Sequence, residues 1–314
     1  MKFYSESDLK TVLDFPKLIS ALRTGFTEKF VIPPRMHLDY PNPEDDTENT
    51  MLLMPAVRVG ETAGVKIVNV TPANSTRSLS SIQGIYYLFH AVSGIPLAIF
   101  DAKSLTNWRT AAASALAASY LAKDSAGSLL MVGTGALAPF LIEAHAAIRP
   151  IRQVIIYGRN RVKAEKLATS FQSRFDQVMV ATELSESVPK ADVISVATFS
   201  PTALINGNWL RPGQHVDLVG SFKPDMREAD DRVIQRSSVF VDNLEMAPIE
   251  SGDLAIPIER GVLQIDDIKG DLFKLCKGSV KGRSNQNEIT VFKSVGHALE
   301  DLVAARLVTQ LKAL

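Results

Sequence analysis

The chain has 314 residues, of which 46% are hydrophobic and 22% charged, and its 34 lysines and arginines balance its 34 aspartates and glutamates. This composition is typical of a folded protein long enough for two domains. It argues against a nucleic-acid-binding protein, which would carry a basic excess, and against a membrane protein, which would carry a long apolar span. The single cysteine, Cys276, excludes an internal disulfide and is predicted to be a small core residue. Together with an N-terminus that lacks a signal-peptide pattern, it indicates a cytoplasmic protein.

The N-terminal third predicts helices followed by antiparallel strands. Residues 5–30 carry an apolar stripe at helical spacing, with Ser5 or Ser7 as the cap and Pro16 separating two short helices. An extended segment at 31–38 and an acidic loop at 41–50 come next. The strands predicted after them cover residues 50–55, 62–70, 82–89 and 95–101, and the last two form a hairpin.

An alanine-rich helix at 104–122 leads into a strand, a glycine turn, a helix and a second strand. The strands are predicted at 129–132 and 154–157, and the helix at 140–148. The turn follows the G-x-G-x-x-A pattern, in which Gly133 permits a tight bend and Gly135 lets the backbone approach a pyrophosphate. The alternative is a chance glycine turn. The pattern favours a dinucleotide site whose first contacts are Gly133, Thr134, Gly135 and Ala136.

The loop after the second strand distinguishes between the two nicotinamide cofactors. An NAD site usually places a carboxylate there for the ribose 2′-hydroxyl. This chain instead has Gly158, Arg159, Asn160 and Arg161, and two guanidinium groups suit a 2′-phosphate. The loop therefore favours NADP(H), with NAD(H) still possible. The alternative is a solvated basic loop that enters a helix at 162–171.

Strands and helices alternate over the rest of the chain, which indicates a doubly wound parallel sheet. Further strands are predicted at 178–181, 193–197, 215–219 and 239–241, and the last helix at 295–312. Cofactors bind beyond the carboxyl ends of such strands. The additional cofactor contacts expected there, or at the helix before the sheet, are Thr110, Thr198, Val219, Gly220 and Ser221. The five histidines show no metal-ligand spacing, so no metal site is predicted.

Three cations, Arg35, Lys66 and Arg109, stand in apolar or small-residue surroundings at the edges of predicted elements. A buried cation without a partner is costly, so Lys66 is expected to meet a partner or a ligand. Three cations converging on one cleft would hold a substrate carboxylate. Each of them alone is equally consistent with an ordinary ion pair or a snorkelling side chain, and Arg109 is also placed to meet cofactor phosphates.

Seven segments, in order over nearly the whole chain, resemble the ornithine cyclodeaminase/mu-crystallin family. They are GVKIV at 64–68, SIQG at 81–84, GIPLA at 94–98, LTNWRTAA at 105–112, VGTGA at 132–136, VGSFKPDMRE at 219–228 and EITVFKSVG at 288–296. The resemblance implies a homodimer with two domains. Residues 1–115 with 292–314 would form a strand-rich α+β substrate-binding and dimerisation domain. Residues 116–291 would form an inserted α/β Rossmann domain that binds NAD(P).

The resemblance also assigns roles to individual residues. Lys66, Arg109 and Arg35 match the carboxylate-binding positions, and Ser81 matches a position with a hydroxyl near the substrate. It therefore implies Lys66, Arg109 and Ser81 as catalytic residues. Cyclodeaminases and the related alanine dehydrogenases carry an aspartate soon after a Val-Gly pair, whereas this chain has Ser221 there.

The departure at Ser221 resembles the branch that reduces cyclic ketimines. Its members convert Δ1-pyrroline-2-carboxylate to proline and Δ1-piperideine-2-carboxylate to pipecolate, which implies an NAD(P)H-dependent oxidoreductase acting on C=N in proline metabolism. The alternatives are an ornithine cyclodeaminase, an amino-acid dehydrogenase and a non-enzymatic mu-crystallin-like binding protein. Asp217 is either functional or a hydrogen-bonding residue of a strand end. Asp225, Arg227 and Glu228 are expected to form a salt-bridge network in one loop.

Overall fold

A computed structural model describes residues 1–44, 47–77 and 79–313. The chain forms two compact units, Met1–Thr110 with His297–Leu314 and Ala111–Gly296. It passes from the first unit to the second within helix α3 (Ala102–Leu121). The second unit is thus inserted between the two segments of the first, and α3 forms the forward connection.

The described residues of the first unit form a six-stranded sheet in the order β1-β6-β5-β4-β3-β2. Neighbouring strands are antiparallel except β1, which is parallel to β6. The strands are β1 (Lys2–Tyr4), β2 (Met36–Pro41), β3 (Glu48–Arg58), β4 (Thr62–Val70), β5 (Ile82–His90) and β6 (Pro96–Asp101). The loop predicted at 41–50 is too long, because its two ends belong to β2 and β3, and its residues 45–46 lie outside the described part.

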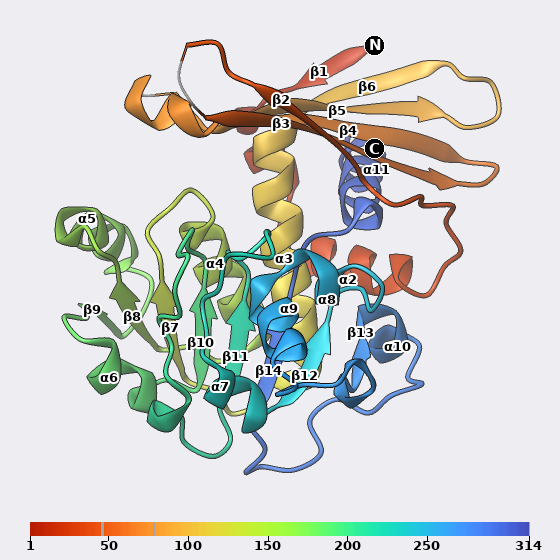
Figure 1. Cartoon of the computed structure of the whole chain (residues 1–314). Coiled ribbons are helices and arrows are strands. Elements are labelled where there is room, and N and C mark those ends of the chain that lie inside the picture. The colour runs from red at the N-terminus through yellow and green to blue at the C-terminus, as the bar shows by residue number, and fades with distance from the viewer. Residues whose placement is uncertain (45–46, 78, 314) are drawn as a thin grey trace. The chain divides into compact units, whose positions relative to one another are not determined.

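The first two helices of the first unit begin where the sequence provides a cap or a backbone constraint. The Ser5 side chain forms a capping box with Asp8 at the start of α1 (Glu6–Val12). Pro16 stands in the first turn of α2 (Phe15–Gly25), where its missing N–H costs nothing. The C-terminal helix α11 (Ala298–Ala313) contacts α2, β3, β4 and β5 and lies along one face of the sheet (Figure 1).

The described residues of the second unit form an eight-stranded sheet in the order β13-β12-β14-β11-β10-β7-β8-β9, with every pair parallel. The strands are β7 (Ser128–Val132), β8 (Gln153–Tyr157), β9 (Gln177–Val180), β10 (Val193–Val196), β11 (His215–Leu218), β12 (Ser238–Val241), β13 (Gly270–Asp271) and β14 (Thr290–Lys293). The strand order reverses between β7 and β10, and ligands of such sheets bind at that point. The predicted α/β Rossmann fold with a strand-rich second part is confirmed.

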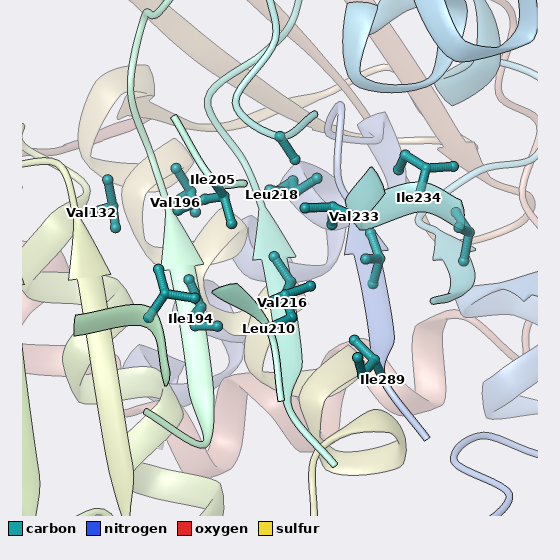
Figure 2. Packing of buried hydrophobic residues seen from close by; sticks show 14 of the residues in the cluster. Val132, Ile194, Val196, Ile205, Leu210, Val216, Leu218, Val233, Ile234 and Ile289 are labelled. Carbon is teal, nitrogen blue, oxygen red and sulfur yellow. The ribbon is translucent and has the colours of Figure 1, made fainter. Parts of the chain in front are cut away.

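Helices follow most of these strands, as in other doubly wound sheets. They are α4 (Ala138–Ile148), α5 (Arg161–Phe171), α6 (Leu184–Ser187), α7 (Asp231–Gln235), α8 (Ala247–Glu250), α9 (Gly252–Glu259), α10 (Leu272–Cys276) and the 3-10 turns Val188–Lys190, Gly207–Trp209 and Ile265–Asp267. Val132, Val196 and Leu218 place their side chains on one face of neighbouring strands, within the apolar core of the unit (Figure 2).

Two further expectations from the sequence are that Cys276 is a core residue and that the chain has no membrane-spanning segment. Cys276 ends α10 and is half-buried, so its prediction as a core residue is wrong. Within the described ranges, no helix is long and apolar enough to cross a membrane.

Candidate active site

Lys66 lies in the middle of β4, on the buried face of the sheet. Register pairs place Met54, Tyr86 and Phe100 in the same ladder across β3, β5 and β6. An ammonium group among such neighbours needs a counter-ion. Helix α11 supplies it, since Nζ of Lys66 lies 2.8 Å from Oδ2 of Asp301. Lys66 is 3% exposed and Asp301 is fully buried.

Arg109 joins this cluster from α3. Its Nε donates to Oδ1 of Asp301 at 3.2 Å, and its Nη1 donates to Oε2 of Glu300 at 2.8 Å. Asp301 therefore bridges the ammonium and the guanidinium groups. The sequence analysis expected the two cations to meet but did not identify the acidic pair on α11. The sequence does contain a sign of this pair, because Glu300 and Asp301 are adjacent carboxylates inside a helix whose buried face is otherwise apolar.

The cluster changes the pKa values of its own members. Burial, then the positive charges of Arg109 and Arg35, lower the pKa of Lys66 to about 8, although Asp301 opposes the change. Burial alone would raise the pKa of Asp301, but Lys66 and Arg109 hold it below its ordinary value. Near neutral pH the cluster thus holds a protonated lysine that loses its proton in mildly alkaline solution.

Arg35 and Ser81 occupy different positions relative to this cluster. The half-buried Arg35 lies near enough to Lys66 for its charge to affect the lysine pKa. Ser81 is half-buried just before β5, and its carbonyl accepts a hydrogen bond from the Thr71 amide. Among the described residues, no hydrogen bond joins the Ser81 hydroxyl to Lys66 or Arg109.

Tyr86 is a member of the site that the sequence analysis missed. It is fully buried and stands opposite Lys66 in the β4–β5 register. Within the described part of the chain its hydroxyl has no hydrogen-bond partner. Burial, and then the charge of Asp301, raise its pKa well above the ordinary value. Gly64 makes room for it, because a Cβ at that position would collide with the phenol.

The glycine turn of the second unit has the form that a pyrophosphate needs. Gly133 has a φ of +116°, and a Cβ there would collide with the Ala197 carbonyl, so only glycine fits. Around Gly135 the space is open, since no described atom lies within 4 Å of a Cβ built on it. Among the described side chains, none caps the N-terminus of α4. These features fit an anionic group lying against the turn and the helix end.

The basic loop after β8 is exposed. Asn160 caps α5 by accepting a hydrogen bond from the Lys163 amide at 3.0 Å, which gives it a structural role. The Nε of Arg161 lies 2.8 Å from the Glu165 carboxylate, and this ion pair is open to solvent. Arg159 is exposed at the carboxyl end of the same strand. The two arginines thus stand at the position where a ribose 2′-substituent reaches this fold.

Partly buried hydrogen bonds hold the other predicted cofactor residues at the ends of β10 and β11. The Thr198 amide and the Gly220 amide both donate to Glu228. The Ser221 hydroxyl donates to the Met226 carbonyl at 2.6 Å. The remaining two positions are the buried Thr110 in α3 and Val219, whose amide donates to the Val196 carbonyl.

Three acidic residues test expectations drawn from the sequence: Asp225, Glu228 and Asp217. The expected salt-bridge network of Asp225, Arg227 and Glu228 is wrong. Arg227 pairs with Asp231 at 2.7 Å, and Asp225 is exposed. Glu228 instead accepts the hydrogen bonds from Thr198 and Gly220. Asp217 is buried within β11. Its Oδ2 accepts a hydrogen bond from the Ser195 hydroxyl at 2.7 Å and lies 3.2 Å from Nε2 of His145. It is therefore a hydrogen-bonding residue of the sheet.

Comparison with known proteins extends over both units. The model of the ornithine cyclodeaminase/mu-crystallin family matches residues 5–312. The Δ(1)-pyrroline-2-carboxylate reductase of Colwellia psychrerythraea is 36% identical over 313 residues, which cover 99% of each chain. The structure of the Thermococcus litoralis Δ(1)-pyrroline-2-carboxylate reductase in complex with NADH and L-proline has a TM-score of 0.93 and 30% identity, covering 100% of this chain and 98% of that one.

A second solved structure has the same fold at lower identity. An archaeal alanine dehydrogenase dimer with bound NAD has a TM-score of 0.91 and 26% identity, covering 99% of this chain and 95% of that one. Both solved structures therefore match the described fold along nearly all of its length. The chain belongs to the ornithine cyclodeaminase/mu-crystallin family.

Proposed function

We propose that this protein is an NAD(P)H-dependent reductase that converts Δ1-pyrroline-2-carboxylate to proline and also accepts the six-membered Δ1-piperideine-2-carboxylate. The observation that carries the proposal is the buried cluster in which Asp301 links Lys66 to Arg109. The likeness to reductases named for this reaction, over nearly the full length, supports it. The first unit would bind the substrate and the second the cofactor.

The substrate offers a carboxylate and a cyclic imine, and Lys66 would act on both. One N–H of the Lys66 ammonium points to Asp301, which leaves its other N–H directions for the substrate. Arg109 and Arg35 add positive charge around the same lysine. We assign these three cations to the substrate carboxylate, which charge-assisted hydrogen bonds would hold in one orientation.

Reduction of an imine adds a hydride to the carbon and a proton to the nitrogen of the C=N bond. The bound nicotinamide supplies the hydride. Lys66 holds a proton at its Nζ below a pH of about 8, and it is the residue that we assign as the proton source, directly or through water. Asp301 orients the ammonium and is itself kept ionised by Lys66 and Arg109.

For the cofactor we propose NADPH in preference to NADH. The glycine turn and the open N-terminus of α4 would receive the pyrophosphate. Arg159 and Arg161 would bind the 2′-phosphate, and the sequence of their loop has no carboxylate to select a free 2′-hydroxyl. Ornithine cyclodeamination is less well supported, because Ser221 is buried and bonded to the Met226 carbonyl where that chemistry uses an aspartate.

We also propose that the protein is a homodimer joined through the open face of the six-stranded sheet. On the face opposite the Lys66 ladder, register pairs align Met36, Leu53, Ile67 and Ile85 across four strands. Met36 is 53% exposed and Ile85 is 39% exposed. An apolar face of this kind is typical of a subunit interface.

A substrate panel tests the proposed reaction. The purified protein is mixed with NADPH or NADH and with five- or six-membered cyclic imino acids, and the absorbance of the reduced nicotinamide is followed. We expect the absorbance to fall with the imino acids and to stay constant with ornithine. Release of ammonia from ornithine with no net change in nicotinamide would instead establish a cyclodeaminase.

A further inference from the structure

Glu228 is a fully buried carboxylate between β11 and α7 that connects two loops of the second unit. Its Oε1 accepts hydrogen bonds from the Thr198 amide at 2.7 Å and from the Thr198 hydroxyl at 2.8 Å. Its Oε2 accepts one from the Gly220 amide at 2.6 Å. Thr198 follows β10 and Gly220 follows β11, so this one side chain joins the carboxyl ends of neighbouring strands.

The contacts suit the two acceptor oxygens of a glutamate at this position. Three donors meet two oxygens, and a glutamine would turn an N–H₂ group toward one of them. The loops also approach each other closely, because a Cβ on Gly220 would collide with the backbone of Thr198. The Thr198 and Gly220 loops are therefore packed too closely to shift and form other contacts in place of those with Glu228.

The position of Glu228 is itself fixed by further buried charges. Oδ1 of Asp253 accepts hydrogen bonds from the Glu228 amide at 2.7 Å and the Ala229 amide at 3.1 Å. Oδ2 of Asp253 lies 3.2 Å from Nζ of Lys293. Burial raises the pKa of Glu228 to about 7, with Asp253 adding to the change and Lys293 opposing it.

The two joined loops lie on one side of the point where the strand order reverses. The glycine turn follows β7, and β8 and β9 continue on its other side. In this fold the strands on each side of the reversal bind one half of a dinucleotide, and the basic loop after β8 marks the adenosine half. The ends of β10 and β11 thus belong to the nicotinamide half. Phe199 and Phe222 pack edge to face across the same loops, with ring centroids 5.8 Å apart.

We propose that Glu228 is a positioning residue for the nicotinamide half of the cofactor. Its carboxylate fixes the Thr198 and Gly220 loops as one surface, against which the nicotinamide ribose and ring are held. The adenosine half depends on other residues. This inference rests on the proposed use of a nicotinamide cofactor, but it does not depend on which substrate is reduced.

The test compares the binding of a whole cofactor with that of its adenosine half, by titration calorimetry without substrate. In Glu228→Gln we expect the dissociation constant of NADPH to rise about tenfold, from the loss of a charged hydrogen bond, and that of 2′,5′-ADP to stay unchanged. Glu245→Gln, which changes an exposed glutamate of the same unit, is the matched control and should change neither. An unchanged NADPH constant, or an equal rise for both ligands, would overturn the inference.

A second variant decides the matter if Glu228→Gln does not fold. Thr198→Val removes only the hydroxyl donor to Oε1 and keeps the shape of the side chain. We expect a smaller rise in the dissociation constant of NADPH, again without a change in that of 2′,5′-ADP. Wild-type dissociation constants for both ligands would contradict the proposal. A protein that binds NADPH in this way but reduces no cyclic imino acid would disprove the proposed function and leave the role of Glu228 intact.

Discussion

The ammonium group of Lys66 lies 2.8 Å from the carboxylate of Asp301, although one residue belongs to a strand of the N-terminal segment and the other to the C-terminal helix. Because the second unit is inserted between these segments, the cluster forms only when α11 returns to the sheet. The ion pair therefore couples the completion of the first unit to the assembly of its charged site.

Replacing Asp301 tests this coupling. Asp301→Asn leaves the buried cations Lys66 and Arg109 without their shared carboxylate. Breaking a buried pair in this way costs about 3 kcal/mol or more in the free energy of unfolding, which urea denaturation would measure. Glu6→Gln, which removes an exposed ion pair with Lys10, should change the stability little. Equal stabilities of the two variants would show that the buried cluster does not hold the unit together.

Lys66 should give the reaction its alkaline limit. Since its pKa is about 8, kcat/KM for the imino acid should fall as the pH rises through that value and the ammonium loses its proton. Lys66→Met should lower kcat/KM by about 100-fold or more at pH 7, whereas Lys29→Met, at an exposed position, should not. In Lys66→Arg the guanidinium stays charged, so the remaining activity should lack the fall near pH 8. A wild-type rate that does not change between pH 7 and 9 would count against this role.

The two glycines of the turn should respond differently to alanine. Gly133→Ala places a side chain at a positive φ and against the Ala197 carbonyl, so it should lower the melting temperature. Gly135→Ala meets no described atom within 4 Å, so the folded chain should tolerate it. Its methyl group would occupy the side from which a pyrophosphate approaches, and we expect at least a tenfold weaker binding of NADPH with little loss of stability. Normal NADPH binding by Gly135→Ala would place the pyrophosphate elsewhere.

The basic loop should determine the choice of cofactor. In the double variant Arg159→Ala with Arg161→Ala, the ratio of kcat/KM for NADPH to that for NADH should fall by about tenfold or more, because the 2′-phosphate loses its charged partners. Lys166→Ala removes an exposed charge farther along α5 and should leave the ratio unchanged. If the double variant keeps the wild-type ratio, the arginines only face solvent.

The open sheet face should control assembly. Ile85→Glu introduces a charge into the apolar ladder of Met36, Leu53 and Ile67, and burying it in an interface is costly. Analytical ultracentrifugation should show a dimer for wild type and a monomer for this variant. Ile265→Glu makes the same change at an exposed position of the second unit and should remain dimeric. A dimer that persists in Ile85→Glu would exclude this face as the interface.

Local patterns predicted most of the elements because their signals lie within a few residues of one another. Ser5 and Pro16 fixed the first two helices, and the glycine turn with its flanking strands indicated the parallel sheet. The cations at 66 and 109 were recognisable because each interrupts an apolar stretch. Burial of Lys66 and Arg109 agrees with the expectation that such cations meet partners.

The parts that the sequence did not predict depend on contacts between distant segments. Asp301 and Glu300 belong to a helix whose periodicity indicates only an amphipathic element, and their partners lie on β4 and α3. Tyr86 looked like an ordinary strand residue until the register placed it beside Lys66. Glu228 was expected to pair with its neighbours in sequence, whereas it meets Thr198 across two strand ends. Spacing along the chain carries no information on such pairings.

The most direct test of the central claim is the initial rate of NADPH oxidation with Δ1-pyrroline-2-carboxylate compared with that for 1-pyrroline, which has the same ring and no carboxylate. If the cations around Lys66 hold the substrate by its carboxylate, the imino acid is reduced to proline and 1-pyrroline is reduced at least 100-fold more slowly. Equal rates for the two rings, or no oxidation of NADPH with the imino acid, would contradict the account.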